Sequence, residues 1–292
     1  MLRTCAFALS LLAASTLDWS AAFAHPGHAQ AEQRLSRITV RSVGEGPAVV
    51  LIPGLASSPA VYHELAAKIG QGRRLIFVQV NGFAGAPASR AGTQDLIPGA
   101  VDELASWLAA NNIEKPAVVG HSMGGLMAMM LAKAHPAAAG RLMIVDALPF
   151  YGMLFGPTAT PDTVRPVVEQ MRGALVSGAA PLEPPPHMSN NPAGRAKVGA
   201  WLKASDRNTV GEALVEDATM DVRPDLPKLA GVPVTVLYAV PSAERRAMTD
   251  ALYREAYKSL PKAKLISVDE SEHFIMLDQP AAFAKEVEDF LK

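Results

Sequence analysis

The sequence predicts an α/β fold, with a mostly parallel central sheet, helices on both faces and an inserted helical cap. Short apolar, β-branched runs alternate with helical patterns along most of the chain, which is typical of a parallel sheet covered by helices. One long segment, 147–225, contains no strand-like run. The 292 residues are enough for one full core with a smaller lid.

Seven segments have the pattern of strands, and most are continuous apolar runs of the kind found in strands buried on both faces. They are 38–43, 48–52, 75–80, 117–119, 142–145, 232–238 and 264–268. Helical periodicity appears between them, in 60–69, 95–110, 123–135, 245–259 and 281–291. We therefore expect residues 37–146 and 226–292 to form the core.

The segment 147–225 interrupts this rhythm. Its first part is rich in proline, and helical patches follow at 164–175, 193–204 and 210–220. We expect it to form a cap over the carboxyl edge of the sheet. Residues 148–155 are strongly apolar, so we expect some of them to fill the cap and others to line an apolar pocket.

The first 24 residues resemble a signal peptide. Arg3 gives a positive start, 6–14 is apolar, and Ala22-Phe23-Ala24 is a small-x-small cleavage pattern. The apolar run is shorter than the ~20 residues that a membrane span needs. We expect cleavage before His25 and an exported protein, periplasmic or secreted; an uncleaved anchor is the alternative.

Residues 25–36 are polar and lack periodicity, so we expect a flexible N-terminal segment. His25 and His28 there form only a weak metal-binding pattern, and a solvated tail is the preferred interpretation. The single cysteine, Cys5, lies within the leader, so the mature chain would carry no thiol or disulfide. We expect no metal.

The charge balance excludes several classes of function. Lys and Arg number 27 against 28 Asp and Glu, a net charge of −1, so there is no basic excess for nucleic acid. No glycine-rich nucleotide-binding motif is present, so no nucleotide cofactor is implied. We expect a small-molecule substrate and no stable membrane insertion after cleavage; the sequence does not indicate an oligomeric state.

The strongest chemical signal is Gly120-His121-Ser122-Met123-Gly124-Gly125. It follows the strand 117–119 and precedes the helix 123–135, which is the context of a nucleophile elbow. Such a turn presents the Oγ of Ser122 above the sheet. It also places the N–H of Met123 at a helix N-terminus, where it can donate to an oxyanion.

A second oxyanion donor is expected in the loop after the strand 48–52. Gly54 allows the backbone to turn toward the serine, and the N–H of Leu55 becomes the candidate. A plain strand-to-loop turn is the alternative. The expected base is His273, which follows the strand 264–268 and therefore lies at the same edge as Ser122. His121 is expected to point away along the turn.

From about Arg37 onward the chain resembles the α/β-hydrolase superfamily. The resemblance depends on 52–55, on the elbow 120–125 and on His273-Phe274-Ile275-Met276-Leu277-Asp278-Gln279-Pro280. It is greatest to the branch of capped esterases, lactonases and C–C hydrolases, and it implies a Ser-His-acid hydrolase without a cofactor. Relatives that dehalogenate or open epoxides use an aspartate at the elbow, so Ser122 disfavours both activities.

The acidic residue of the expected Ser-His-acid triad departs from the family pattern. The resemblance implies an aspartate just after the strand 232–238, but Ala239-Val240-Pro241-Ser242-Ala243-Glu244 contains none. Glu244, the only carboxylate in that loop, is the first choice. Asp146, directly after the strand 142–145, is the second, because some relatives carry the acid there. An absent acid is the third possibility.

The sequence therefore predicts a serine hydrolase that cleaves a small or medium, largely apolar carboxylic ester or lactone through an acyl-enzyme. Two alternatives stay open. One is a ligand-binding or weakly active homologue with an impaired triad. The other is a C–C bond hydrolase that uses the same serine and histidine.

Overall fold

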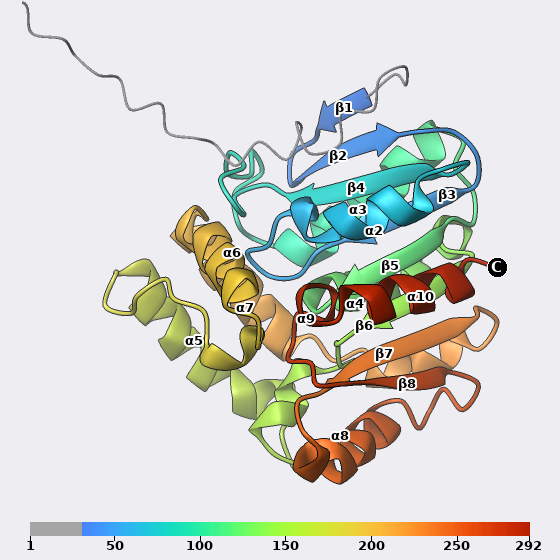
Figure 1. Cartoon of the computed structure of the whole chain (residues 1–292). Coiled ribbons are helices and arrows are strands. Elements are labelled where there is room, and N and C mark those ends of the chain that lie inside the picture. The colour runs from blue at the N-terminus through green and yellow to red at the C-terminus, as the bar shows by residue number, and fades with distance from the viewer. Residues whose placement is uncertain (1–30) are drawn as a thin grey trace, which may run out of the picture.

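The computed structural model describes residues 31–292, which form an eight-stranded sheet with helices on both faces (Figure 1). The strands are β1 (Ala31–Arg34), β2 (Ile38–Val43), β3 (Ala48–Ile52), β4 (Arg74–Val80), β5 (Ala117–His121), β6 (Arg141–Val145), β7 (Val234–Val240) and β8 (Lys264–Asp269). Their order across the sheet is β1-β2-β4-β3-β5-β6-β7-β8. The β1–β2 and β2–β4 pairs are antiparallel and all others are parallel. The predicted fold class is confirmed.

Helices connect the strands. Those outside the segment between β6 and β7 are the 3-10 helices η1 (Pro59–Tyr62) and η2 (Pro136–Ala138), and the α-helices α2 (His63–Ile69), α3 (Leu96–Ala110), α4 (Met123–Ala134), α8 (Ala243–Ala256), α9 (Ile275–Asp278) and α10 (Pro280–Phe290). The elements expected from the sequence agree with these to within three residues at either end.

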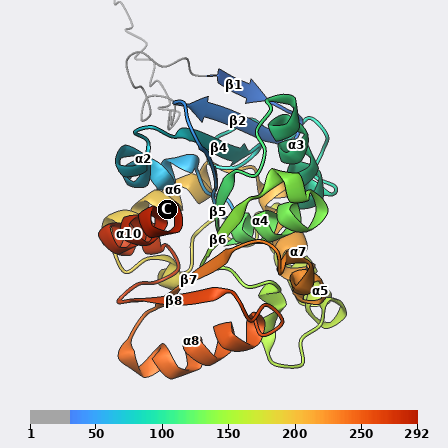
Figure 2. The same ribbon diagram turned by 90° about the vertical axis from the view of Figure 1, so that its right-hand side faces the viewer.

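Helices cover both faces of the sheet (Figure 2), and two apolar clusters, one on each face, hold them there. Successive residues of a strand point to opposite faces. Val118 of β5 accordingly packs with α3, α4 and α8, whereas Val119 packs with α2 and α10. Both residues are fully buried. Burial on both faces explains why the parallel strands have continuous apolar sequences.

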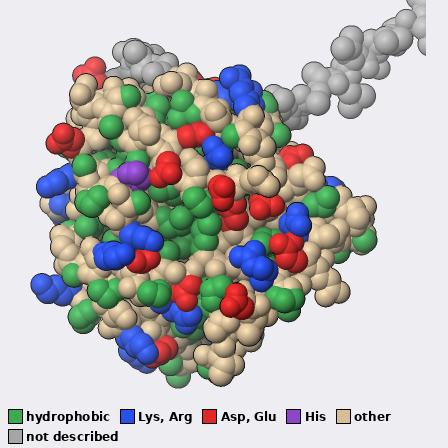
Figure 3. Space-filling view, turned by 180° about the vertical axis from the view of Figure 1, so that it is seen from behind, with side chains coloured by type: hydrophobic (Ala, Val, Ile, Leu, Met, Phe, Trp, Pro, Cys, Tyr) green, Lys and Arg blue, Asp and Glu red, His purple; other side chains and the backbone are tan. Residues whose placement is uncertain are grey.

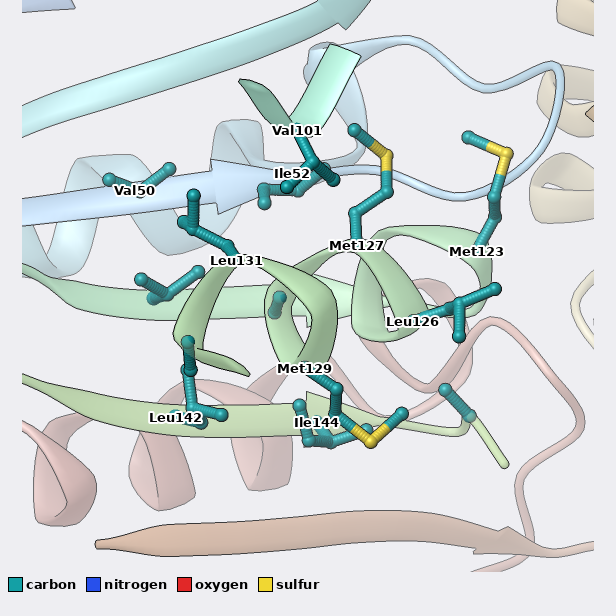
Figure 4. Close-up of a cluster of buried hydrophobic side chains, with 14 of the residues drawn as sticks. Val50, Ile52, Val101, Met123, Leu126, Met127, Met129, Leu131, Leu142 and Ile144 are labelled. Atoms are coloured by element: carbon teal, nitrogen blue, oxygen red, sulfur yellow. The ribbon is translucent and has the colours of Figure 1, made fainter. Parts of the chain in front are cut away.

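Helix α4, which begins at the elbow, lies deep in the core (Figure 4). Its methionines fill space in the way expected of a flexible apolar side chain. Met127 lies toward Ile52 of β3, and Met129 lies beside Ile144 of β6. Both methionines are at most 1% exposed. This packing fixes the position of the turn that precedes the helix.

The N-terminal part of the described chain differs from the expectation of flexibility. Residues 31–34 form β1, an edge strand whose backbone pairs with β2. The Gln33 side chain also accepts a hydrogen bond from Trp107 Nε1, at 2.9 Å. Because an edge strand is held largely by backbone hydrogen bonds, it needs no apolar periodicity, and residues 31–34 have none that would predict a strand. The leader 1–24 and the pair His25 and His28 lie outside the described residues.

The chain between β6 and β7, here called the insertion, holds only helices. They are η3 (Tyr151–Phe155), α5 (Pro161–Val176), η4 (Pro186–Met188), α6 (Pro192–Lys203), α7 (Arg207–Thr219) and η5 (Arg223–Leu229). Figure 1 shows α5, α6 and α7 grouped at one end of the sheet. Within the apolar stretch 148–155, Leu148 and Phe150 are buried, while Tyr151, Leu154 and Phe155 are exposed.

The insertion is anchored on the core by hydrogen bonds. The N–H of Asp206 donates to Gly82, just after β4, at 2.7 Å. Glu216 of α7 accepts from the backbone N–H groups of Leu96 and Ile97, at 2.8 and 2.6 Å. These groups belong to the first turn of α3, where an anionic acceptor satisfies free donors and complements the helix dipole.

The surface carries a mixed charge pattern. Lys and Arg side chains alternate with Asp and Glu side chains over the face seen in Figure 3, in keeping with the net charge of −1. Within residues 31–292, no helix is both long and apolar enough to span a membrane.

Candidate active site

Ser122 lies in a strained turn between β5 and α4. Its backbone angles, φ 54° and ψ −125°, are rare for a residue with a side chain. Such a conformation costs about 1–3 kcal/mol and persists only where surrounding contacts impose it. Here the Ser122 N–H donates to Val145 at 2.9 Å, and its carbonyl accepts from Gly125 at 2.7 Å. The side chain is half-buried.

Two glycines allow other backbone segments to approach this turn. A Cβ atom on Gly124 would collide with the carbonyl oxygen of Ile52, so only glycine lets α4 start so close to the end of β3. A Cβ atom on Gly54 would lie 3.0 Å from the Ser122 Cβ and 3.1 Å from His121 Nδ1. The loop after β3 therefore passes directly beside the serine.

The two residues expected to supply oxyanion donors, Leu55 and Met123, both belong to segments beside Ser122. Met123 is the first residue of α4, so its N–H has no carbonyl four residues earlier within the helix. Leu55 follows Gly54 in the loop beside Ser122 and is half-buried. An arrangement of this kind can stabilise negative charge that develops on an oxygen bound to the serine.

His273 is paired with Asp146. The distance from His273 Nδ1 to Asp146 Oδ2 is 2.7 Å, and the two side chains are 22% and 14% exposed. Because an ionised carboxylate can only accept, the proton lies on Nδ1, and Nε2 keeps a free lone pair. That is the tautomer a general base needs.

Asp146 is held rigidly by further donors. Its Oδ1 accepts from the N–H of Ala239 at 2.9 Å and from the hydroxyl of Tyr253 at 3.0 Å. The Tyr253 ring is stacked on Tyr238, with 4.4 Å between ring centroids. Asp146 itself has φ 44°, a second strained position at the carboxyl edge. The sequence offered no signal for Tyr253, because α8 approaches Asp146 only in the folded chain.

The structure does not bring Glu244, the first choice for the acid, to the histidine. Glu244 lies in the first turn of α8 and is exposed, and a hydrogen bond with Ser242 lowers the pKa of its carboxyl. The ranking of the two carboxylates is therefore reversed by the geometry. The physical reason is strand order: β6 is the direct neighbour of β5, so the residue after β6 emerges beside Ser122.

His121 does not point away along the turn as expected. Its buried ring lies against His273, with 4.6 Å between ring centroids, and its Nε2 is 3.0 Å from the His273 carbonyl oxygen. Burial lowers the pKa of His121 to about 3, so the ring is neutral and Nε2 donates. Among the described residues, its buried Nδ1 has no hydrogen-bond partner. His121 thus fixes the backbone that carries His273.

The loop around His273 is also bonded to the insertion. The N–H of Phe274 donates to the carbonyl of Met188 at 2.8 Å. Asp278, the last residue of α9, accepts from Ser189 Oγ at 2.5 Å and from the N–H of Glu272 at 2.9 Å. The insertion therefore helps to position the histidine.

One ionisable side chain of the insertion is buried without an obvious reason. Asp217 of α7 is 8% exposed, and burial raises the pKa of its carboxyl to about 7, an effect that the charge of His273 partly offsets. Among residues 31–292, no group of three or more His, Cys, Asp or Glu side chains is arranged to hold a metal ion. Asp217 is therefore not a metal ligand within such a group.

The burial of Asp217 predicts a pH-dependent stability. Between about pH 4 and pH 7 the folded chain keeps a proton on Asp217 that the unfolded chain has released, so the free energy of unfolding should fall as pH rises through this range. Measured against Asp217→Asn, the free energy of unfolding of the wild type should fall by up to about 4 kcal/mol over this range. Above pH 7 the difference between the two proteins should stay constant. Denaturant unfolding of both proteins at pH 5, 6, 7 and 8 measures this, and a pH-independent difference would contradict it.

Comparison with known proteins places this arrangement in a family. The model of the "Alpha/beta hydrolase family" matches residues 49–286, and the chain belongs to this family. The chain is 31% identical over 114 residues to a pimeloyl-[acyl-carrier protein] methyl ester esterase of Aeromonas salmonicida, which covers 39% of this chain and 43% of the esterase. It is also 31% identical over 108 residues to the sn-1-specific diacylglycerol lipase ABHD11 of Danio rerio, over 36% and 33% of the two chains. These matches span less than half of each relative.

Solved structures share the fold over most of the chain. An enol-lactonase from Burkholderia xenovorans LB400 superposes with a TM-score of 0.68 at 20% identity, over 87% of this chain and 96% of the lactonase. A thermophilic esterase from Thermogutta terrifontis gives a TM-score of 0.69 at 18% identity, over 90% and 98%. At these identities the likeness concerns the fold alone.

Proposed function

We propose that this protein is a serine hydrolase that cleaves a small or medium, largely apolar carboxylic ester or lactone through an acyl-enzyme. The observation that carries the proposal is the 2.7 Å hydrogen bond between His273 Nδ1 and Asp146, at the edge where Ser122 occupies its strained turn. The names of the similar proteins, an esterase, a lipase and a lactonase, agree with an ester-type substrate.

The proposed reaction proceeds in two halves. The Oγ of Ser122 attacks the substrate carbonyl while His273 Nε2 takes its proton, and the N–H groups of Leu55 and Met123 stabilise the oxyanion. The imidazolium then gives its proton to the leaving alkoxide, and the acyl group stays on Ser122. In the second half His273 removes a proton from water, which attacks the acyl-enzyme; the imidazolium then returns this proton to Ser122 Oγ as the bond between Oγ and the acyl carbon breaks and the acid leaves. Asp146 stabilises the imidazolium in both halves.

The function is tested by turnover of defined substrates. We expect the purified protein to hydrolyse 4-nitrophenyl acetate, butyrate or octanoate, or a γ- or δ-lactone, above the rate in buffer. A folded protein that hydrolyses none of them would contradict the proposal. A 1,3-diketone in the same series separates the C–C hydrolase alternative, which predicts faster cleavage of the diketone than of any ester.

The alternative of a weakly active, ligand-binding homologue arose from the missing aspartate after β7. The hydrogen bond between Asp146 and His273 weakens this alternative, because the imidazole does have a carboxylate partner. If the triad is impaired, the hydrolysis rate should not depend on Asp146. The variants Asp146→Asn and Glu244→Gln measure this dependence.

We also propose that the protein is exported. The pattern of residues 1–24 supports this, namely a positive start, an apolar run and Ala22-Phe23-Ala24. Intact-mass measurement of the protein from the periplasm or medium of expressing cells should show a chain that begins at His25. A chain that keeps residues 1–24 would contradict cleavage.

A further inference from the structure

Asp217 of α7 is a buried acid without a partner. The residue is 8% exposed, none of the hydrogen bonds or ion pairs of the described chain involves it, and its carboxylate oxygens are not among the fully buried polar atoms there. Buried carboxyl groups are ordinarily paired, because leaving one unpaired in an apolar environment is costly. Folding alone therefore gives no reason for an acid at this position.

The helix geometry shows which way Asp217 faces. Val210, Ala213 and Asp217 are spaced by three and four residues, so they form one stripe along α7. Val210 and Ala213 pack in the apolar cluster that also contains Met123, the residue after the proposed nucleophile. The neighbours of Asp217 in the chain, Glu216 and Ala218, instead contact α3 and the cluster within the insertion. Asp217 therefore lies on the side of α7 that packs on the core, between the side that contacts α3 and the side that packs within the insertion.

The electrostatic interactions of Asp217 link it to the histidine of the site. It interacts electrostatically with His273 and with Tyr151 of η3. The nearby cations are occupied elsewhere: Arg223 pairs with Asp221 at 2.6 Å, and Arg165 donates to Thr219 at 3.3 Å. The acid therefore interacts with the proposed catalytic histidine, and no cation among the described residues pairs with it.

We propose that Asp217 is a substrate-recognition residue, and that its carboxylate binds a protonated amine carried by the acyl or the alcohol part of the ester. This inference rests on the proposed ester hydrolysis and narrows its substrate class. A cationic N–H donor would give the buried acid the charge-assisted hydrogen bond that it lacks in the free protein. The remainder of the substrate would still meet apolar side chains.

The test uses ester pairs that differ only in charge. On the alcohol side the pair is 2-(dimethylamino)ethyl acetate and 3-methylbutyl acetate; on the acyl side it is ethyl 4-(dimethylamino)butanoate and ethyl 5-methylhexanoate. Within each pair a protonated nitrogen replaces a carbon of the same shape. The measured quantity is the ratio of kcat/KM for the amine to that for its neutral counterpart at pH 7, in wild type and in Asp217→Asn.

In at least one pair we expect Asp217→Asn to lower this ratio about tenfold or more, as loss of a charge-assisted hydrogen bond predicts. The matched control is Glu212→Gln, which removes a carboxylate from the same helix; Glu212 pairs with Arg172 of α5 at 3.7 Å. The control should leave both ratios unchanged.

The inference about Asp217 and the proposed function would be contradicted by different results. If the neutral esters are hydrolysed through Ser122 but neither ratio changes in Asp217→Asn, the inference about Asp217 is wrong and the proposed function stands. If a folded wild type hydrolyses none of the four esters, nor any substrate named above, the proposed function fails and the inference fails with it. Circular dichroism of Asp217→Asn shows whether the variant is folded.

Discussion

Replacing Ser122 with alanine is expected to lower kcat for ester hydrolysis by roughly 10⁴- to 10⁶-fold. In the proposed reaction the serine oxygen forms the bond to the acyl group, and the turn between β5 and α4 holds no other hydroxyl. What activity remains would come from binding and from oxyanion stabilisation alone.

The measurement is steady-state hydrolysis of the best 4-nitrophenyl ester, with circular dichroism to show that the variant is folded. Alanine is a fair replacement because it keeps the Cβ atom that meets Gly54 and has the same backbone freedom as serine. If the folded variant kept more than about one hundredth of wild-type turnover, ester hydrolysis would not proceed through Ser122.

Replacing Asp146 with asparagine should lower kcat by about 10³- to 10⁴-fold. An asparagine amide can turn its NH₂ group toward His273 Nδ1, which favours the tautomer with the proton on Nε2. That tautomer cannot accept the proton of Ser122. The wild-type carboxylate also stabilises the imidazolium, which the neutral amide does not.

The matched control for this variant is Glu244→Gln. It removes the carboxylate that the sequence favoured, but its exposed side chain bonds to Ser242 rather than to the histidine, so turnover should stay within about twofold of wild type. The opposite pattern, with a large loss for Glu244→Gln and little for Asp146→Asn, would restore Glu244 as the acid. A small loss of turnover in both variants would favour a site in which no carboxylate assists the histidine.

Much of the fold could be predicted because its signals are local. A continuous apolar run such as 75–80 specifies a buried strand wherever it lies, and the glycines around Ser122 mark a strand–turn–helix junction within six residues. His273 could be placed because it follows the last strand, and all parallel strands end at one edge. Edge strand β1 was missed since its pairing depends on β2 rather than on its own side chains.

The rest of the site depends on which elements become neighbours. Asp146 emerges beside Ser122 because β6 adjoins β5, an order that spacing along the chain does not reveal. Tyr253 approaches Asp146 from α8, and His121 meets the carbonyl of a residue 152 positions later. Asp217 looks like any helical acid in the sequence, and only its burial distinguishes it.

The central claim is that Ser122 is an activated nucleophile, and its most direct test is labelling with a fluorophosphonate. Intact-mass analysis of the purified wild type should show a single adduct, and Ser122→Ala should show none under the same conditions. This readout needs no knowledge of the natural substrate. A folded wild type that forms no adduct, or an adduct that persists in Ser122→Ala, would contradict the account.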